Sequence, residues 1–155
     1  MKKYRIRNVD PSKDRHIVVE YNARINDECE SACCKKKGCE EYKEKWRGEE
    51  NAERIWNLML DTLKDERNIA IIIESENGTA IGYFWAKMNE IRPSCLCMEL
   101  WDIYIEERYR KQGIASDLVI YAEDTPSKLA TSFTFLCCSK NDCNIIAFLS
   151  ILTLS

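Results

Sequence analysis

The sequence predicts one α/β domain in which helices cover both faces of a mixed central sheet. Three observations favour this fold class. Strand-like and helical patterns follow one another in the order β, α, α, β, β, β, α, β, α. Asn77-Gly78 separates two apolar runs, as a tight turn between neighbouring antiparallel strands does. Between Glu99 and Ser116, an apolar strand continues through a polar loop into a glycine-containing helix start.

The N-terminal half of the chain is expected to form one strand and two helices. Residues 4–9 alternate polar and apolar side chains, as a half-buried strand does. The Asp-Pro-Ser run at residues 10–12 is a helix-start signal, and we expect that helix to reach about Ile25. The polar, cysteine-bearing segment 26–48 is expected to be a loop or a short irregular helix. Residues 51–63 carry apolar side chains at helical spacing, which predicts a second, amphipathic helix.

The C-terminal half is expected to supply most of the sheet. The predicted elements, in chain order, are strands at residues 68–74, 80–89 and 96–105, a helix at 113–123, a strand at 133–137 and a helix at 142–149. The first of these strands is rich in β-branched residues, which predicts burial. No internal repeat or linker divides the chain, so residues 1–155 are expected to form one domain.

Composition narrows the function classes. The chain has 155 residues and a formal net charge of −3, so it carries no general attraction to nucleic acid. It has no apolar run long enough to span a membrane and no secretory signal at its start, which predicts a cytoplasmic protein. Its nine cysteines are an odd number, so we expect reduced thiols and no disulfide framework.

The loop before the helix at 113–123 has the features of an anion site. The first N–H groups of a helix lack partners within the helix, and the helix dipole adds partial positive charge there. Gly113 and Ala115 let the backbone turn tightly and leave room for a pyrophosphate, while Arg110 and Lys111 add positive charge. Alone, such a turn is also compatible with an ordinary strand–helix connection.

Residues 110–115, Arg-Lys-Gln-Gly-Ile-Ala, resemble the R/Q-x-x-G-x-G/A signature of the GNAT (N-acetyltransferase) superfamily. The preceding run at 107–110 and the asparagine-containing segment at 139–148 resemble the same family, most strongly across residues 99–118. The resemblance implies a GNAT-like acyl-CoA N-acyltransferase fold. It also implies an enzyme that passes the acetyl group of acetyl-CoA directly to a primary amine, without an acyl-enzyme intermediate.

The resemblance places the coenzyme on the strand–loop–helix at residues 96–124. The residues whose N–H groups are expected to hold the pyrophosphate are Arg110, Lys111, Gln112, Gly113, Ile114, Ala115 and Ser116. The strand backbone at Ile103, Tyr104 and Ile105 is expected to bond the pantetheine amides. That mode requires this strand and the strand at 133–137 to splay apart, leaving backbone groups unpaired.

A general base must take a proton from the acceptor ammonium before it attacks. Glu99 is the leading candidate, and strand alternation would place it on one face with Trp101, Ile103 and Ile105. Asp102 would point to the opposite face and is the second candidate. Trp101 is expected to line the acceptor pocket. The alternative is that Glu99 is only a solvated carboxylate.

The C-terminal region departs from the family pattern. Many relatives carry a tyrosine on the last helix that protonates the leaving thiolate. Here that position is occupied by Phe148 or Ile151, and neither side chain can donate a proton. The two further strands typical of the family have no counterpart, so an apolar sheet edge is expected, covered by a homodimer partner or by strand exchange, or left by a truncation. A catalytically impaired acyl-CoA-binding module is therefore an open alternative.

The cysteines of segment 26–48 support a third alternative, a thiol or zinc protein. Cys29, Cys33, Cys34 and Cys39 have the spacing C-x3-C-C-x4-C, which lacks the C-x2-C pairs typical of zinc sites. They are weak metal candidates, and we expect no metal. Acidic residues of the same segment suit a cationic acceptor, although three lysines at 35–37 oppose one. The acceptor is therefore left open between a small amine, a peptide N-terminus and a lysine.

Overall fold

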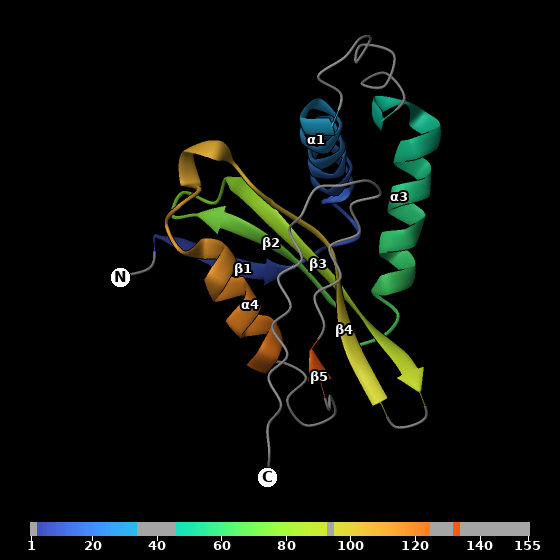
Figure 1. The fold of residues 1–155 in the computed structure, drawn as a ribbon. Helices are drawn as coiled ribbons and strands as arrows, with labels where there is room; N and C mark the ends of the chain where they lie inside the picture. The colour runs from blue at the N-terminus through green and yellow to red at the C-terminus, as the bar shows by residue number, and fades with distance from the viewer. Residues whose placement is uncertain (1–2, 34–45, 93–94, 125–131, 134–155) are drawn as a thin grey trace.

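The structure, a computed structural model, describes residues 3–33, 46–92, 95–124 and 132–133. Within these residues a five-stranded sheet lies at the centre, in the order β1-β2-β3-β4-β5 (Figure 1). The strands are β1 (Tyr4–Asn8), β2 (Ile69–Ser75), β3 (Ala80–Arg92), β4 (Cys95–Ile105) and β5 (Ser132–Phe133). The first four are antiparallel neighbours, whereas β5 runs parallel to β4. The mixed sheet is as predicted.

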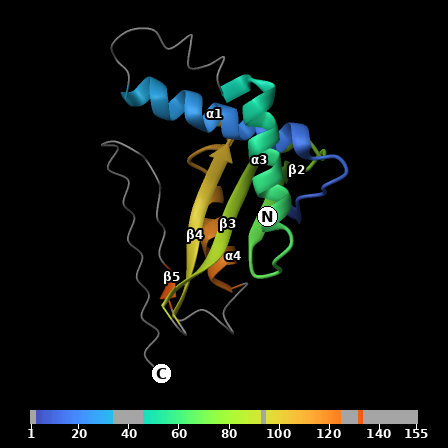
Figure 2. The same cartoon turned by 90° about the vertical axis from the view of Figure 1, so that its right-hand side faces the viewer.

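Helices cover both faces of this sheet, which confirms the predicted fold class (Figure 1; Figure 2). α1 (Arg15–Cys33) and α3 (Glu49–Thr62) pack on one face, here called the α1/α3 face. α4 (Ile114–Asp124) packs on the other, the α4 face. A short 3-10 turn, Glu107–Tyr109, joins β4 to the loop before α4. No helix in the described part of the chain is long and apolar enough to cross a membrane.

β2 contributes to both cores, which explains its continuous apolar run. Ile72 is fully buried on the α1/α3 face, where it packs with Met59 of α3. Ile71 and Ile73 are buried on the α4 face with Leu118 of α4. Because successive residues of a strand point to opposite faces, a strand covered on both sides needs apolar residues at every position.

α1 is longer than the sequence predicted. Its end was expected near Ile25, but the helix continues to Cys33, so the first third of segment 26–48 is helical and not a loop. No glycine or proline interrupts residues 26–33. Ion pairs from Arg47 to Glu20 (2.9 Å) and Asp27 (2.8 Å) also fasten this part of α1 to the start of the next helical region. Such tertiary contacts extend helices beyond what local propensity indicates.

The β2–β3 hairpin has the predicted turn. Gly78 has a φ of +81°, and its N–H donates to the carbonyl of Ser75 (2.9 Å). β3 then continues to Arg92, three residues beyond the expected end at Asn89. Only Ser132–Phe133 of the region expected to form the last strand is described. The predicted helix at 142–149, the positions Phe148 and Ile151, and the predicted dimer edge lie outside the described residues.

Candidate functional site

A β-bulge in β4 determines which side chains share a face. Asp102 is opposite Trp85 on β3, and Leu100 is opposite the next residue, Ala86, so Trp101 has no counterpart on β3. An extra residue in one strand shifts the in-and-out alternation by one position. The prediction that Glu99, Trp101, Ile103 and Ile105 share one face is therefore wrong.

The bulge brings the three predicted catalytic and acceptor residues together. Asp102 contacts Tyr83 and so lies on the α1/α3 face. The prediction that it points to the face opposite Glu99 and Trp101 is therefore wrong. Trp101 stacks on Trp85 of the same face, with ring centroids 5.0 Å apart. Glu99 is opposite Lys87, whose ammonium lies over the Trp101 ring. By contrast, Ile103 and Ile105 pack into the core on the α4 face.

The Asp102 carboxylate is held at one oxygen and open at the other. Its Oδ2 accepts hydrogen bonds from the Tyr83 hydroxyl and from Asn22 Nδ2 of α1 (2.8 Å). Oδ1 accepts none from the described residues and is not among their buried unpaired atoms. Burial raises the pKa of Asp102 above its usual range, although the hydrogen bonds from Tyr83 and Asn22 oppose this. Asp102 is therefore a carboxylate with an anchored orientation and a raised proton affinity.

The neighbouring polar residues are less enclosed. Glu99 Oε2 accepts a hydrogen bond from Asn89 Nδ2 (2.5 Å), and the side chain is only partly buried. Trp101 is 37% exposed, which makes it the accessible apolar surface beside Asp102. Lys87 Nζ lies 4.5 Å from the centre of the Trp101 ring, a cation–π arrangement. Among Glu99, Lys87 and Trp101, only Trp101 is exposed, and Asp102 beside it is partly buried.

The loop between β4 and α4 presents a row of backbone donors. Lys111 and Gly113 have positive φ values of 60° and 82°. The Gly113 carbonyl accepts from the Asp117 N–H (3.0 Å), so Gly113 caps α4. Within the described residues, the N–H groups of positions 111–116 donate to no protein oxygen. Such a turn followed by a helix start attracts anions.

Gly113 is required for its backbone conformation. A Cβ built at this position meets no atom within 4 Å, so protein packing does not exclude a side chain. The φ of +82° does, because L-residues other than glycine are strained there. The space that a Cβ would occupy at Gly113 is open among the described residues.

Among the described residues, no strand pairs with the outer edge of β4 beyond Met98. β5 pairs with β4 only at Cys97 and Met98 among the described residues. The Glu106 N–H donates to the Ile81 carbonyl on β3 (2.8 Å), so by alternation Tyr104 also directs its backbone groups to β3. Ile103 and Ile105 therefore direct theirs to the opposite, open edge. Of the three residues predicted to bond pantetheine, these two have the appropriate orientation.

The Arg110 side chain binds residues outside the loop that precedes α4. Its Nε donates to the Ile105 carbonyl (2.7 Å), and its guanidinium pairs with Glu28 of α1 (2.6 Å). The guanidinium also lies 5.3 Å from the centre of the Tyr104 ring. Arg110 thus ties the end of β4 to α1, and Lys111 is the cation of this motif that is exposed.

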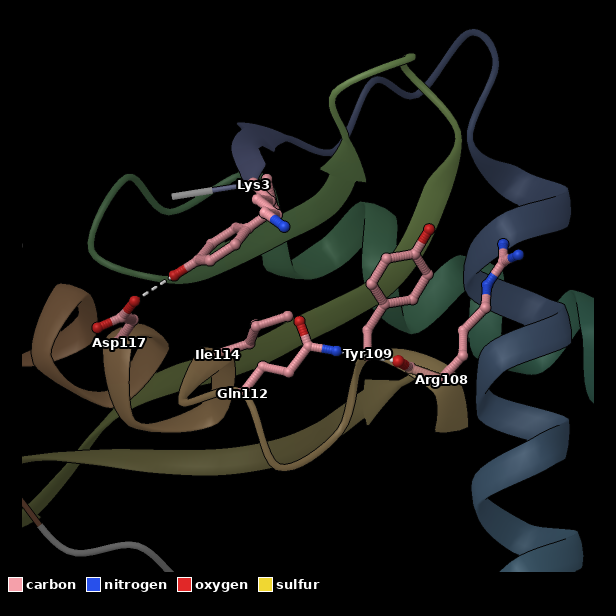
Figure 3. Close-up of a pocket in the computed structure, with 7 residues that line it drawn as sticks. Lys3, Arg108, Tyr109, Gln112, Ile114 and Asp117 are labelled. Carbon is pink, nitrogen blue, oxygen red and sulfur yellow. Dashed lines mark hydrogen bonds between the residues drawn. The ribbon is translucent and has the colours of Figure 1, made fainter. Parts of the chain in front are cut away.

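A cavity of about 570 Å³ lies on the other side of the loop, between β1 and α4. Its lining residues are Lys3, Tyr4, Arg108, Tyr109, Gln112, Ile114 and Asp117. Figure 3 shows Gln112 and Ile114 directed into it, and the Tyr4 hydroxyl donates to Asp117 (Figure 3). This cavity does not include Asp102 or Trp101, so it is separate from the predicted catalytic and acceptor residues.

Sequence reasoning did not identify three residues of the site. Asn22 and Tyr83 anchor Asp102, and Lys87 covers Trp101. Their positions depend on strand register and on the packing of α1, which no local pattern reveals. The predicted cysteine site falls outside the described side chains. Elsewhere in the described residues, no group of three or more potential metal ligands is present.

Comparison with known proteins identifies the family. A sequence model described as "Acetyltransferase (GNAT) family" matches residues 35–151, which is most of the chain. The chain therefore belongs to the GNAT acetyltransferase family, as its motif predicted. No curated protein matches the chain in sequence.

Solved structures agree on the fold. PaiA N-acetyltransferase from Thermoplasma acidophilum, in complex with coenzyme A, matches with a TM-score of 0.63 and 20% identity, over 87% of this chain and 79% of that one. A predicted acetyltransferase with acetyl-CoA from Clostridium acetobutylicum gives 0.65 and 14%, over 86% and 80%. Glucosamine-6-phosphate N-acetyltransferase from Arabidopsis thaliana gives 0.58 and 14%, over 90% and 86%. At these identities the likeness establishes the fold alone.

Proposed function

We propose that this protein transfers the acetyl group of acetyl-CoA to a primary amine. The observation that carries the proposal is the row of unpaired N–H groups at residues 111–116, in a chain of the GNAT acetyltransferase family. Two similar structures have coenzyme A or acetyl-CoA in their descriptions, which supports the same donor here. The partly buried, hydrogen-bonded carboxylate of Asp102 beside an exposed tryptophan supports an amine acceptor.

The donor would bind along β4 and the loop. The pyrophosphate would accept hydrogen bonds from N–H groups of residues 111–116, assisted by the dipole of α4 and by Lys111. The pantetheine amides would pair with Ile103 and Ile105 on the open edge of β4. Because the Ile105 carbonyl already accepts from Arg110, Ile103 offers the less committed backbone groups. This path leads the thioester toward the bulge at Trp101.

Asp102 would act as the general base. The anchored Oδ2 fixes the carboxylate, and the open Oδ1 can take a proton from the acceptor ammonium directly or through water. Its raised pKa brings its proton affinity closer to that of the group it must deprotonate, which favours general-base catalysis. Glu99 lies on the same face and is the second candidate, since it lacks this enclosure.

The reaction would then proceed by direct attack. The neutral amine nitrogen attacks the acetyl carbonyl carbon, the carbon–sulfur bond breaks, and coenzyme A leaves as a thiol after gaining a proton. In this proposal a backbone N–H at the β4 bulge would polarise the acetyl carbonyl, since the bulge interrupts the regular pairing with β3 at Trp101.

Thiol release with acetyl-CoA and a panel of primary amines tests this function. We expect amine-dependent release of coenzyme A together with formation of the N-acetyl product, confirmed by mass spectrometry. Binding of acetyl-CoA without turnover of any amine would contradict the proposal and would favour the acyl-CoA-binding module. Absence of binding would contradict the coenzyme site itself.

A further inference from the structure

Lys87 places an alkyl ammonium at the candidate acceptor position. It lies on β3 directly opposite Glu99 of β4, and its Nζ is 4.5 Å from the centre of the Trp101 ring. Its side chain therefore reaches across from β3 onto a residue of β4. Within the described residues Lys87 makes no ion pair at contact distance, although Asp61 of α3 is close enough to interact with it electrostatically, and its ammonium rests on the aromatic face. A primary amine on a flexible aliphatic chain is the chemical class that the proposed reaction consumes.

The surroundings of Lys87 are those of the proposed transfer point. Trp101, under the ammonium, is the bulge residue, and the next residue is Asp102 with its open Oδ1. The recorded pairing of β4 with β5 ends at Met98, so the edge beyond it is where a thioester can approach. The attacking amine of Lys87 and the proposed base Asp102 therefore lie on the neighbouring strands β3 and β4, on the same face of the sheet. The proposed path of the thioester follows the edge of β4 beyond Met98.

We propose that Lys87 is itself an acetyl acceptor, so that the protein acetylates its own chain in cis at this position. This inference rests on the proposed function. The Lys87 ammonium gives one proton to Asp102, its nitrogen attacks the acetyl carbonyl carbon, and the carbon–sulfur bond breaks as the amide bond forms. The nitrogen loses its second proton, one proton ends on the departing coenzyme A sulfur, and the other passes to solvent.

Another lysine of the chain provides an internal comparison. Lys64, just after α3, pairs with Asp61 (2.8 Å) and is exposed. Chemical acetylation by a reactive thioester should modify the exposed Lys64 at least as fast as Lys87, which is partly buried. Preference for Lys87 in the folded protein therefore reports catalysis and not reactivity.

The test is a time course of the full chain with acetyl-CoA and no added amine, followed by peptide mass spectrometry. We expect Lys87 to be acetylated at least about tenfold faster than Lys64, because a positioned amine reacts as an intramolecular nucleophile. The Lys87 rate should not change with protein concentration. It should fall in Asp102→Asn, and the preference should vanish in urea. Lys87→Arg should lower amine-independent thiol release to the slow chemical rate, while Lys64→Arg should leave it nearly unchanged.

Several outcomes would overturn the inference. Equal rates at Lys87 and Lys64 would assign the modification to chemical acetylation. A Lys87 rate proportional to protein concentration would assign it to a second molecule. Turnover of added amines with Lys87 unmodified would refute self-acetylation and leave the proposed function intact. Bound acetyl-CoA with neither amine turnover nor Lys87 acetylation would refute both.

Discussion

At the scale of single residues, Asp102 and Glu99 differ in how the protein holds each carboxylate. Asp102 is anchored by Tyr83 and Asn22 and is desolvated, whereas Glu99 has one recorded partner, Asn89, and lies at the rim. An oriented, desolvated carboxylate is a better base than a mobile, hydrated one. The structure thus reverses the order of the two candidates that strand alternation suggested.

Substitution of the two carboxyl groups should separate their roles. Asp102→Asn is expected to reduce kcat by about a hundredfold or more, because general-base catalysis contributes on that scale. Glu99→Gln is the matched control and should have the smaller effect. Both variants should bind acetyl-CoA as the wild type does, which isothermal calorimetry can check. A larger loss of kcat in Glu99→Gln would make Glu99 the base.

Asp102→Asn should also change how stability depends on pH. Because burial raises the pKa of Asp102, the folded state favours the protonated carboxyl. Its contribution to stability is complete below the unfolded pKa and is lost as pH rises through the folded pKa. An asparagine can still accept hydrogen bonds from Tyr83 and Asn22, so the variant should gain thermal stability over the wild type at pH 8. Thermal melts at pH 8 and pH 4 measure this. A variant less stable at pH 8 would contradict the assigned direction.

At the scale of elements, two glycines hold the site in place for different reasons. Gly113 adopts a left-handed conformation with open space around it. Gly82 of β3 lies against β4, where a Cβ would come within 2.3 Å of the Tyr104 carbonyl oxygen. The first glycine shapes the loop, and the second lets β3 approach β4 closely.

Alanine at these two positions should have distinguishable effects. Gly113→Ala should cost about 1 kcal/mol of stability through left-handed backbone strain, and should weaken acetyl-CoA binding. Gly82→Ala should cost more, about 3 kcal/mol, because the contacting atoms are backbone and cannot move aside. Urea denaturation of both variants measures the difference. Equal stability of the two variants would show that the β3–β4 contact is looser than described.

The elements also show what the sequence could and could not predict. The β2–β3 turn was predictable because Asn77-Gly78 encodes it locally, and the loop at 110–115 because its glycine and basic residues form a contiguous motif. The bulge at Trp101 was not predictable, because it depends on how β4 pairs with β3 and no local sequence pattern encodes that pairing. The extension of α1 depended on ion pairs with Arg47, which is distant in sequence.

At the scale of the whole molecule, charged groups join β1, β2 and the start of α1. Arg7 donates to Glu74 on β2 (2.6 Å) and to Asp14 (2.5 Å), and both carboxylates are almost completely buried. The hydrogen bond from Arg7 helps to lower the pKa of Glu74. Burial alone would raise the pKa of Asp14. The hydrogen bonds that Asp14 accepts from Arg7 and from the Asp10 N–H outweigh burial, so its pKa is also lowered. The network fastens the β1 edge of the sheet, which lies opposite the β5 edge.

Removal of Arg7 should therefore destabilise the fold without touching the site. Arg7→Met is expected to cost about 3–5 kcal/mol, because two buried carboxylates lose their partner. Since the pKa values of Glu74 and Asp14 are lowered, the wild-type advantage should be present above their unfolded pKa values. It should be lost as pH falls through the folded ones. Denaturation at pH 7 and at low pH, with exposed Arg67→Met as control, tests this. An equal cost at both pH values would contradict it.

The central claim is that the N–H groups after β4 hold the acyl donor. An acetyl-CoA titration followed through backbone amide NMR signals tests it most directly, because each donor is observed individually. The account predicts saturable shifts at residues 111–116 and at Ile103 and Ile105, and small ones in β1. Saturable binding that leaves residues 111–116 unperturbed, with the shifts gathered in another part of the chain, would contradict it.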